Sequence, residues 1–173
     1  MSEDIRPCKL GKDKIFEFSE IVARDLGYKP GDSLAPIVEK LGGKIHYQSL
    51  LEMDSASGSI SISDIGNFEI NLADHTSESR DRFTICHELG HYFLHYIFHK
   101  SNGDEIGSLK AMRYGDSFAE YEANWFAAGF LMPKEEFTSS YVKFAGDLYS
   151  LASHFFVSVQ AAEVRAKSLN LLN

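Results

Sequence analysis

The segment His87-Glu88-Leu89-Gly90-His91 carries the residue types and the spacing of a metal site. Residues four apart on an α-helix lie on one face, about 6 Å apart along the axis, so two imidazoles there can bind the same cation. Neutral imidazole suits zinc, and a glutamate beside the first histidine is typical of hydrolytic zinc sites. We therefore predict that His87 and His91 are metal ligands and that Glu88 is the general base.

A catalytic zinc needs a third protein ligand and keeps one coordination position open. Glu120 and Glu122 are the candidates further along the chain, in a segment that also reads as a helix. Glu120 has an alternative role as the last member of a capping box that begins at Ser117. Asn124 lies four residues after Glu120, on the same helical face, where it could hydrogen-bond a metal ligand. We favour Glu120 as the third ligand, with Glu122 as the alternative.

Other residues near these motifs could contribute to a site, but each has a simpler interpretation. His95 would lie too far from His87 along a regular helix to bind the same ion, so we expect a hydrogen-bonding or packing role. Tyr114, in a segment expected to be a loop over 100–115, could stabilise an oxyanion or could be an ordinary loop tyrosine. Cys8 and Cys86 are far apart in different settings, so we expect no disulfide and a buried Cys86.

The composition describes one folded domain and limits its partners. The chain has 173 residues, 44% of them apolar, with 17 basic and 25 acidic side chains and a net charge of −8. This size and apolar content suffice for a single core. The acidity argues against nucleic acid as a direct partner, because phosphate binding depends on Lys and Arg. Without a long apolar stretch or a basic N-terminal region, we expect a cytoplasmic protein and no membrane partner.

The hydrophobic periodicity predicts an α+β fold in which a small, mostly antiparallel sheet separates N-terminal helices from the motif helix. Alternation around 45–47, 60–62 and 68–72 indicates three strands, the last two joined in a hairpin at 64–67. We expect one domain over 1–173, divided into an N-terminal helical segment (1–32), a catalytic core (33–132) and C-terminal helices (133–173). Helical patterns cover 12–26, 33–42, 76–99, 117–132, 133–144, 147–156 and 158–171.

Two motifs together resemble a known family. The segment Arg82–His95 resembles the active helix of the ImmA/IrrE family of zinc metallopeptidases, and Glu120–Ala128 with the following Leu131-Met132-Pro133 resembles its second motif. Phe155–Leu172 is similar to its closing helices. The resemblance implies a zincin-like fold with a zinc ion held by two histidines and Glu120. Gly129-Phe130 is a departure, because the family usually has an acidic residue and a leucine there.

The resemblance also implies a kind of substrate. Members of the family are often encoded beside a helix-turn-helix (XRE-type) repressor, and some cleave that repressor and so relieve repression of stress or mobile-element genes. We therefore expect a protein substrate of this DNA-binding type, recognised in part by strand addition at 67–73, which we predict to be a sheet edge.

Three alternatives to a zinc peptidase stay open, and a fourth is disfavoured. The chain could be a toxin–antitoxin component, or a regulatory binding module that keeps the metal site without peptidase activity. Mn²⁺ or Fe²⁺ could replace Zn²⁺ at a His/Glu site. DNA binding by the last two helices is disfavoured, because the final helix carries only Arg165 and Lys167 against Glu163.

Overall fold

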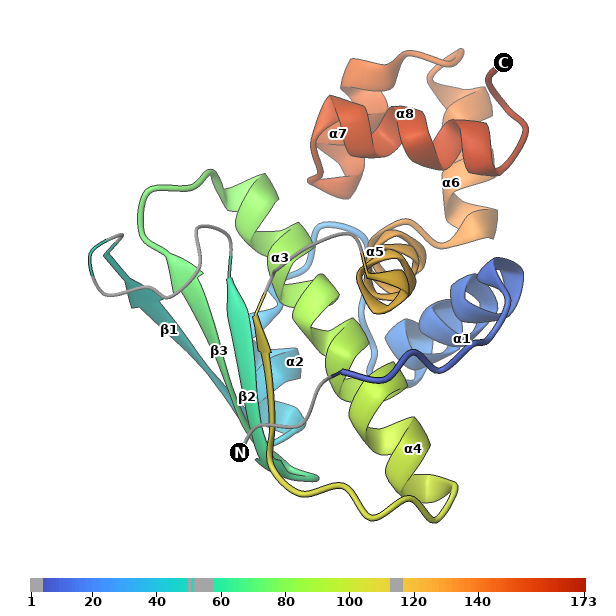
Figure 1. Cartoon of the computed structure of the whole chain (residues 1–173). Coiled ribbons are helices and arrows are strands. Elements are labelled where there is room, and N and C mark those ends of the chain that lie inside the picture. Colours follow the sequence, from blue (N-terminus) through green and yellow to red (C-terminus); the bar gives the residue numbers. More distant parts are fainter. Residues whose placement is uncertain (1–4, 50, 52–57, 113–116) are drawn as a thin grey trace.

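The computed structural model describes residues 5–49, 51, 58–112 and 117–173. It has the predicted α+β architecture, in which helices pack on one side of a four-stranded sheet (Figure 1). The elements in chain order are α1 (Lys12–Asp25), α2 (Ala35–Lys40), β1 (Gly43–Gln48), β2 (Ser59–Asp64), β3 (Asn67–Ala73), α3 (Glu78–Gly90), the π-helical turn η1 (His91–Ile97), α4 (Phe98–Ser101), β4 (Leu109–Met112), α5 (Phe118–Leu131), α6 (Lys134–Lys143), α7 (Leu148–Phe155) and α8 (Val159–Ser168).

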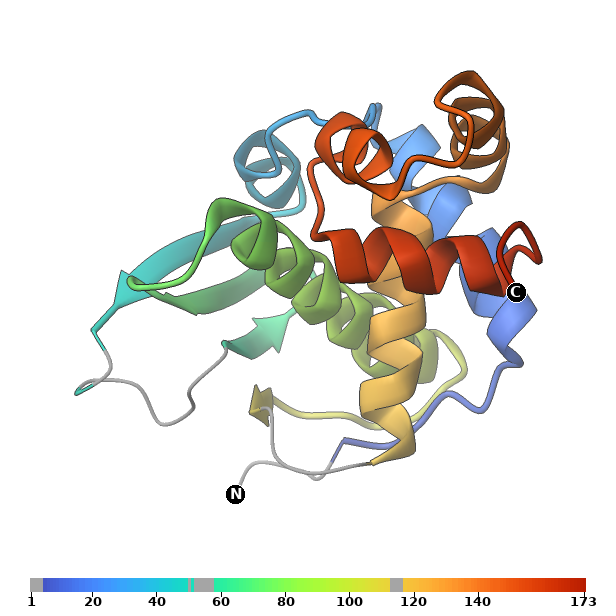
Figure 2. The same ribbon diagram turned by 90° about the horizontal axis from the view of Figure 1, so that it is seen from above.

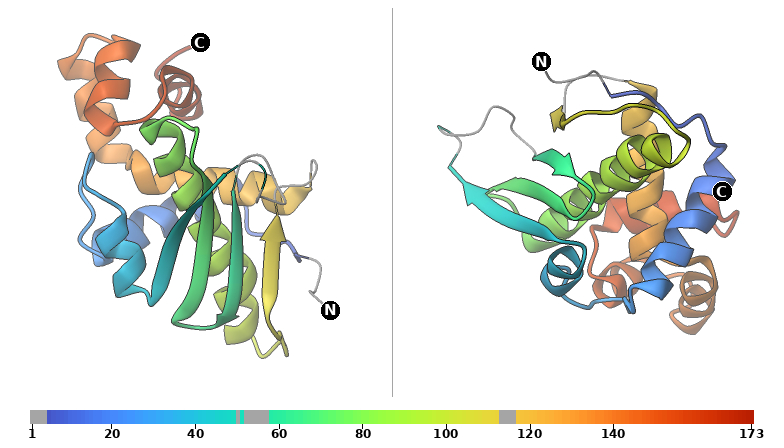
Figure 3. Two further views of the ribbon diagram at one scale, coloured as in Figure 1. Left: turned by 90° about the vertical axis from the view of Figure 1, so that its left-hand side faces the viewer. Right: turned by 90° about the horizontal axis from the view of Figure 1, so that it is seen from below.

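The sheet has the strand order β1-β3-β2-β4 and is mostly antiparallel, as predicted. β2 and β3 form the expected hairpin, in which Gly66 supplies a positive φ of 76° at the turn. β1 pairs with β3 in parallel, and β4 pairs with β2 antiparallel. Two expectations are wrong. The segment expected to be a loop over 100–115 contains the strand β4, and β3 is an inner strand, so the edges are β1 and β4 (Figure 3).

The buried face of the sheet packs against α3 and η1. Apolar side chains at alternate positions of β2 and β3 are fully buried, and Cys86 is buried as predicted, with a free thiol. The Tyr92 ring lies 4.3 Å from the Phe68 ring, and its hydroxyl accepts a hydrogen bond of 2.8 Å from the Gly66 backbone N–H. This contact joins the motif helix to the hairpin turn and fixes its position over the sheet.

The helices α3 and α5 cross at close range, which brings the two sequence motifs together (Figure 2). Gly90 lies in the crossing, where a Cβ atom would be only 2.9 Å from the Ala123 Cα. A side chain at position 90 would therefore push the helices apart. The glycine inside the H-E-x-x-H motif thus has a structural reason.

The departure at Gly129-Phe130 is explained by the packing of α1 against α5. A Cβ atom on Gly129 would collide with the Ser19 Oγ and crowd Phe16 of α1. Phe130 is fully buried, with its ring centroid 5.0 Å from that of Tyr28. This sequence therefore replaces an acidic residue by a close helix–helix contact.

The C-terminal helices α6, α7 and α8 form a layer beyond α5 (Figure 1). Arg165 of α8 is 1% exposed and fixes this layer to the rest of the chain. Its guanidinium donates to the Met132 carbonyl (2.9 Å) and to the Glu20 carboxylate (2.7 Å) and lies 4.4 Å from the Phe16 ring centroid. Among the described residues, no helix combines the length and the apolar character needed to cross a bilayer.

Candidate metal centre

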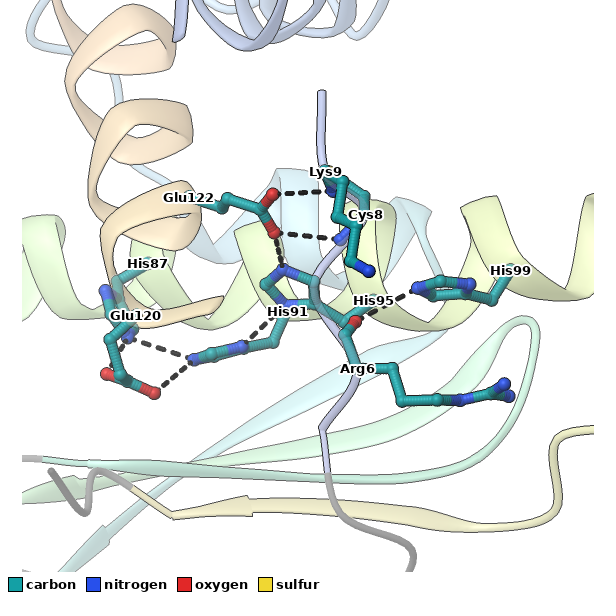
Figure 4. A network of polar contacts seen from close by, with 9 residues as sticks. All are labelled: Arg6, Cys8, Lys9, His87, His91, His95, His99, Glu120 and Glu122. Atoms are coloured by element: carbon teal, nitrogen blue, oxygen red, sulfur yellow. Dashed lines mark hydrogen bonds and ion pairs between the residues drawn. The ribbon is translucent and has the colours of Figure 1, made fainter. Parts of the chain in front are cut away.

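Three predicted ligands converge at the crossing of α3 and α5. The Nε2 atoms of His87 and His91 are 3.1 Å apart, and each is 3.2 Å from a carboxylate oxygen of Glu120 (Figure 4). Both histidines are buried, and the Glu120 side chain is 14% exposed. The structure thus brings together His87, His91 and Glu120 as one group of potential ligand atoms.

The spacing of these atoms fits a small tetrahedral ion. His87 Nε2 faces the Oε2 of Glu120 and His91 Nε2 faces its Oε1, and these separations of about 3.2 Å suit zinc bonds of about 2.0–2.2 Å to imidazole and carboxylate. Three protein ligands also leave one corner open, as a catalytic site requires. The residues present therefore fit the metal that the motif predicts.

Glu120 does not act as a helix cap. Ser117 is the N-cap residue of α5, but its side chain makes no capping hydrogen bond, so the predicted capping box is not formed. Burial alone would raise the pKa of the Glu120 carboxyl, but hydrogen bonding and charge interactions with His87 and His91 outweigh burial and lower this pKa well below its usual value. The carboxylate is therefore ionised and available to a cation.

Asn124 fixes the protonation of His87. The Asn124 Oδ1 lies 2.8 Å from the His87 Nδ1 and can only accept a hydrogen bond, so the imidazole proton is on Nδ1. The lone pair of Nε2 then points at Glu120, toward the proposed metal position. This is the supporting contact that the spacing of Asn124 and Glu120 suggested.

A buried chain of polar groups fixes the protonation of His91 in the same way (Figure 4). The His95 Nε2 donates to Glu122 at 2.8 Å, which leaves the His95 Nδ1 to accept from the His91 Nδ1 at 2.9 Å. His95 is almost fully buried, and this burial lowers its pKa to about 4, so it is neutral near pH 7. The predicted hydrogen-bonding role of His95 is therefore confirmed.

The helix geometry around His95 differs from the expected regular helix. Residues His91–Ile97 form the π-helical turn η1, whose i→i+5 hydrogen bonds make a wider turn than an α-helix. In this turn the His95 ring contacts the Nδ1 atom of His91 and does not reach the proposed metal position. π turns of this kind are frequent at functional sites.

Glu122 lies away from His87, in a second group of polar residues. Its carboxylate accepts hydrogen bonds from the backbone N–H groups of Cys8 (2.9 Å) and Lys9 (2.8 Å) in addition to His95. Burial alone would raise the pKa of Glu122, but the bonds from His95 and Cys8 outweigh it and lower the pKa. The N-terminal arm, residues 5–11, is thus anchored to the residue that orients His95.

Cys8, His95 and Glu122 are themselves close enough to form a metal-binding group. The Cys8 thiol is buried, and burial raises its pKa to about 12, so the thiol stays protonated at neutral pH. Both oxygens of Glu122 already accept backbone hydrogen bonds. The side chains of Cys8, His95 and Glu122 are therefore suited to hold the His95–His91 pair in place and not to bind a cation. The anchoring of the N-terminal arm by Glu122 was not predicted, because no sequence pattern near Cys8 indicates it.

Glu88 is 1% exposed and lies on α3 beside the first histidine. Its Oε1 is 3.4 Å from the place that a Cβ atom would occupy on Gly58, the residue before β2, and Gly58 also approaches Thr84 closely. A side chain at position 58 would thus collide with Thr84, one helical turn before Glu88. Tyr114, the candidate for an oxyanion contact, lies outside the described residues.

Comparison with known proteins places this geometry in a family. A family model for the IrrE N-terminal-like domain, a peptidase family, matches residues 38–167. The chain belongs to this family. The match includes both helices of the metal centre, so His87, Glu88, His91 and Glu120 are part of the IrrE-like domain itself. No curated protein matches the chain.

A solved structure with a similar fold is a Mycobacterium tuberculosis transcriptional regulator. It superposes with a TM-score of 0.60 at 18% sequence identity and covers 86% of this chain. The match takes up 45% of the regulator, so this chain spans less than half of that protein's length. The likeness shows that this chain shares its fold with part of that regulator.

Proposed function

We propose that the chain is a zinc-dependent endopeptidase that cleaves a protein partner. The observation that carries this proposal is the convergence of His87, His91 and Glu120 at mutual distances that fit zinc, with the buried Glu88 next to them. The membership of the chain in a metallopeptidase family supports the same conclusion.

Each of these residues has a defined task in peptide hydrolysis. His87 and His91 would hold the ion through Nε2, and Glu120 through its carboxylate. When bound, the ion acts as a Lewis acid that polarises the scissile carbonyl and lowers the pKa of water. The Glu88 carboxylate takes a proton from the attacking water and returns it to the leaving amine.

The edge strand β4 supports a mode of substrate binding. β4 pairs with β2 on one side and ends the sheet on the other. It directly precedes the segment that leads to α5 and Glu120 (Figure 3). An extended substrate segment can add to such an edge through backbone hydrogen bonds. We infer that β4, and not β3, receives the substrate.

We propose an XRE-type helix-turn-helix repressor encoded nearby as the protein substrate, so that cleavage relieves repression. The net charge of −8 favours electrostatic attraction to a basic, DNA-binding protein. The description of the structurally similar Mycobacterium tuberculosis protein as a transcriptional regulator is in keeping with a regulatory setting.

The test is to incubate the zinc-loaded chain with the purified repressor encoded beside it. We expect a defined pair of fragments with the wild type, and intact repressor with the Glu88→Gln variant or with a chelator. A repressor that binds the wild type but stays intact for hours would refute peptidase function. If wild type and Glu88→Gln release the intact repressor from its operator DNA equally well, the chain would instead be a regulatory binding module or a toxin–antitoxin component.

A further inference from the structure

A cavity of about 660 Å³ lies beside the metal centre. It is bounded by the N-terminal half of α3, the face of α5 that carries Asn124 and Trp125, the start of α1 and one side of α8 along its whole length. Its volume lies in the range of cavities that bind small ligands or short peptide segments.

The cavity adjoins the proposed catalytic site, although His87, Glu88, His91 and Glu120 are not among its lining residues. Asn124 lines the cavity and also hydrogen-bonds the His87 Nδ1 at 2.8 Å. Thr84 and Phe83 line it too, one helical turn before Glu88 and His87 on the same face of α3. A molecule in the cavity would therefore be separated from the proposed ligand His87 by the Asn124 side chain.

The charge of the cavity is opposite to that of the chain as a whole. Its lining contains Lys12, Arg80 and Arg165 and, among the described residues, no acidic side chain. Arg165 is already paired with Glu20. Lys12 and Arg80 form no ion pair within the described part of the chain. The Lys12 ammonium lies 5.9 Å from the Trp125 ring, at the cavity wall. The cavity thus offers two cationic side chains that can pair with a bound anion, in a protein with a net charge of −8.

The backbone adds to this positive potential. The cavity lining includes first-turn residues of α3, around the N-cap Ser77, and of α8, around the N-cap Ser158. Helix N-termini carry partial positive charge and favour anions. Two such termini and the two cationic side chains act on the same space.

We propose that this cavity is a specificity subsite that binds acidic residues of the protein substrate close to the scissile bond. This inference rests on the proposed peptidase function. Carboxylates of the substrate pair with Lys12 and Arg80, and the aliphatic parts of the segment pack against Phe83 and Trp125. The expected substrate is a basic protein with a stretch of acidic residues near its cleavage site.

The binding test uses Trp125, the single tryptophan of the chain, as a fluorescent reporter in the cavity wall. The probes are the blocked peptides acetyl-Ala-Glu-Glu-Ala-amide and acetyl-Ala-Gln-Gln-Ala-amide, which differ only in charge. We expect a saturable fluorescence change with the acidic peptide and binding of the neutral one that is weaker by about tenfold or more. The readout requires no hydrolysis, so it is independent of peptidase activity.

Matched variants decide whether the named cations carry the effect. Lys12→Gln and Arg80→Gln should each weaken binding of the acidic peptide by about tenfold, whereas Lys14→Gln, an exposed lysine of α1 outside the cavity lining, should leave it unchanged. Equal binding of acidic and neutral peptides, or full binding by Lys12→Gln and Arg80→Gln, would overturn the subsite. Charge-selective binding in a chain that cleaves nothing would refute the proposed function but leave the anion-binding subsite in place.

Discussion

Replacing His95 by leucine should weaken zinc binding although His95 is not a proposed ligand. The change removes the acceptor of the His91 Nδ1 proton at 2.9 Å and the donor to Glu122 at 2.8 Å. Without His95, the hydrogen bond that holds the proton of His91 on Nδ1 is lost. Loss of such a supporting contact typically costs 10- to 100-fold in metal affinity, about 1.4–2.7 kcal/mol.

The matched control for this change is His99→Leu. His99 lies one turn further along the same helical run and is partly buried, with hydrogen bonds of 3.0 Å to Asp104 and to the Arg6 carbonyl. The His99→Leu variant therefore loses two hydrogen bonds of similar length, and neither of them involves His91. We expect both variants to be destabilised when metal-free, but only His95→Leu to lose zinc affinity.

The assay is a competition titration with a fluorescent zinc chelator at pH 7.5, because direct titration cannot resolve a tight site. Circular dichroism and thermal unfolding of the metal-free proteins establish that each variant is folded. A folded His95→Leu protein with the zinc affinity of the wild type would refute the role of the His91–His95–Glu122 chain. Equal losses in His95→Leu and His99→Leu would assign the effect to general destabilisation.

Three further predictions concern individual residues of the site and the helix packing. Glu88→Gln should lower kcat/KM for the substrate by about 100-fold or more while the zinc content per chain, measured by mass spectrometry, stays that of the wild type. Asn124→Leu should weaken zinc binding about tenfold in the same chelator titration, since His87 loses its Nδ1 partner. Gly129→Ala should lower the free energy of unfolding by about 1–3 kcal/mol in urea denaturation, because its Cβ would collide with Ser19. Gly107→Ala is the control, as its Cβ would meet no atom within 4 Å.

The parts of the site that depend on local spacing could be predicted from the sequence. His87 and His91 lie on one helical face because four residues span about one turn, and the same rule relates Glu120 to Asn124. The preference for Glu120 over Glu122 also depended on that rule. A residue two positions on points roughly to the opposite side of the helix, which is why Glu122 meets His95 and the N-terminal arm.

The parts that depend on long-range contacts could not be predicted. The hydrogen bonds from Cys8 and Lys9 to Glu122 join residues more than 100 positions apart, and no sequence pattern near Cys8 indicates them. β4 has only four residues, too few to show a clear alternation. The edge assignment of 67–73 failed because β1 pairs in parallel with β3, a pairing that periodicity does not specify.

The most direct test of the account is the position of the metal itself, measured by anomalous diffraction at the zinc edge from crystals of the zinc-loaded chain. We expect one strong peak about 2.0–2.2 Å from the Nε2 atoms of His87 and His91 and from a carboxylate oxygen of Glu120. A peak between Cys8, His95 and Glu122, or no peak at His87 and His91 in fully loaded crystals, would contradict the account.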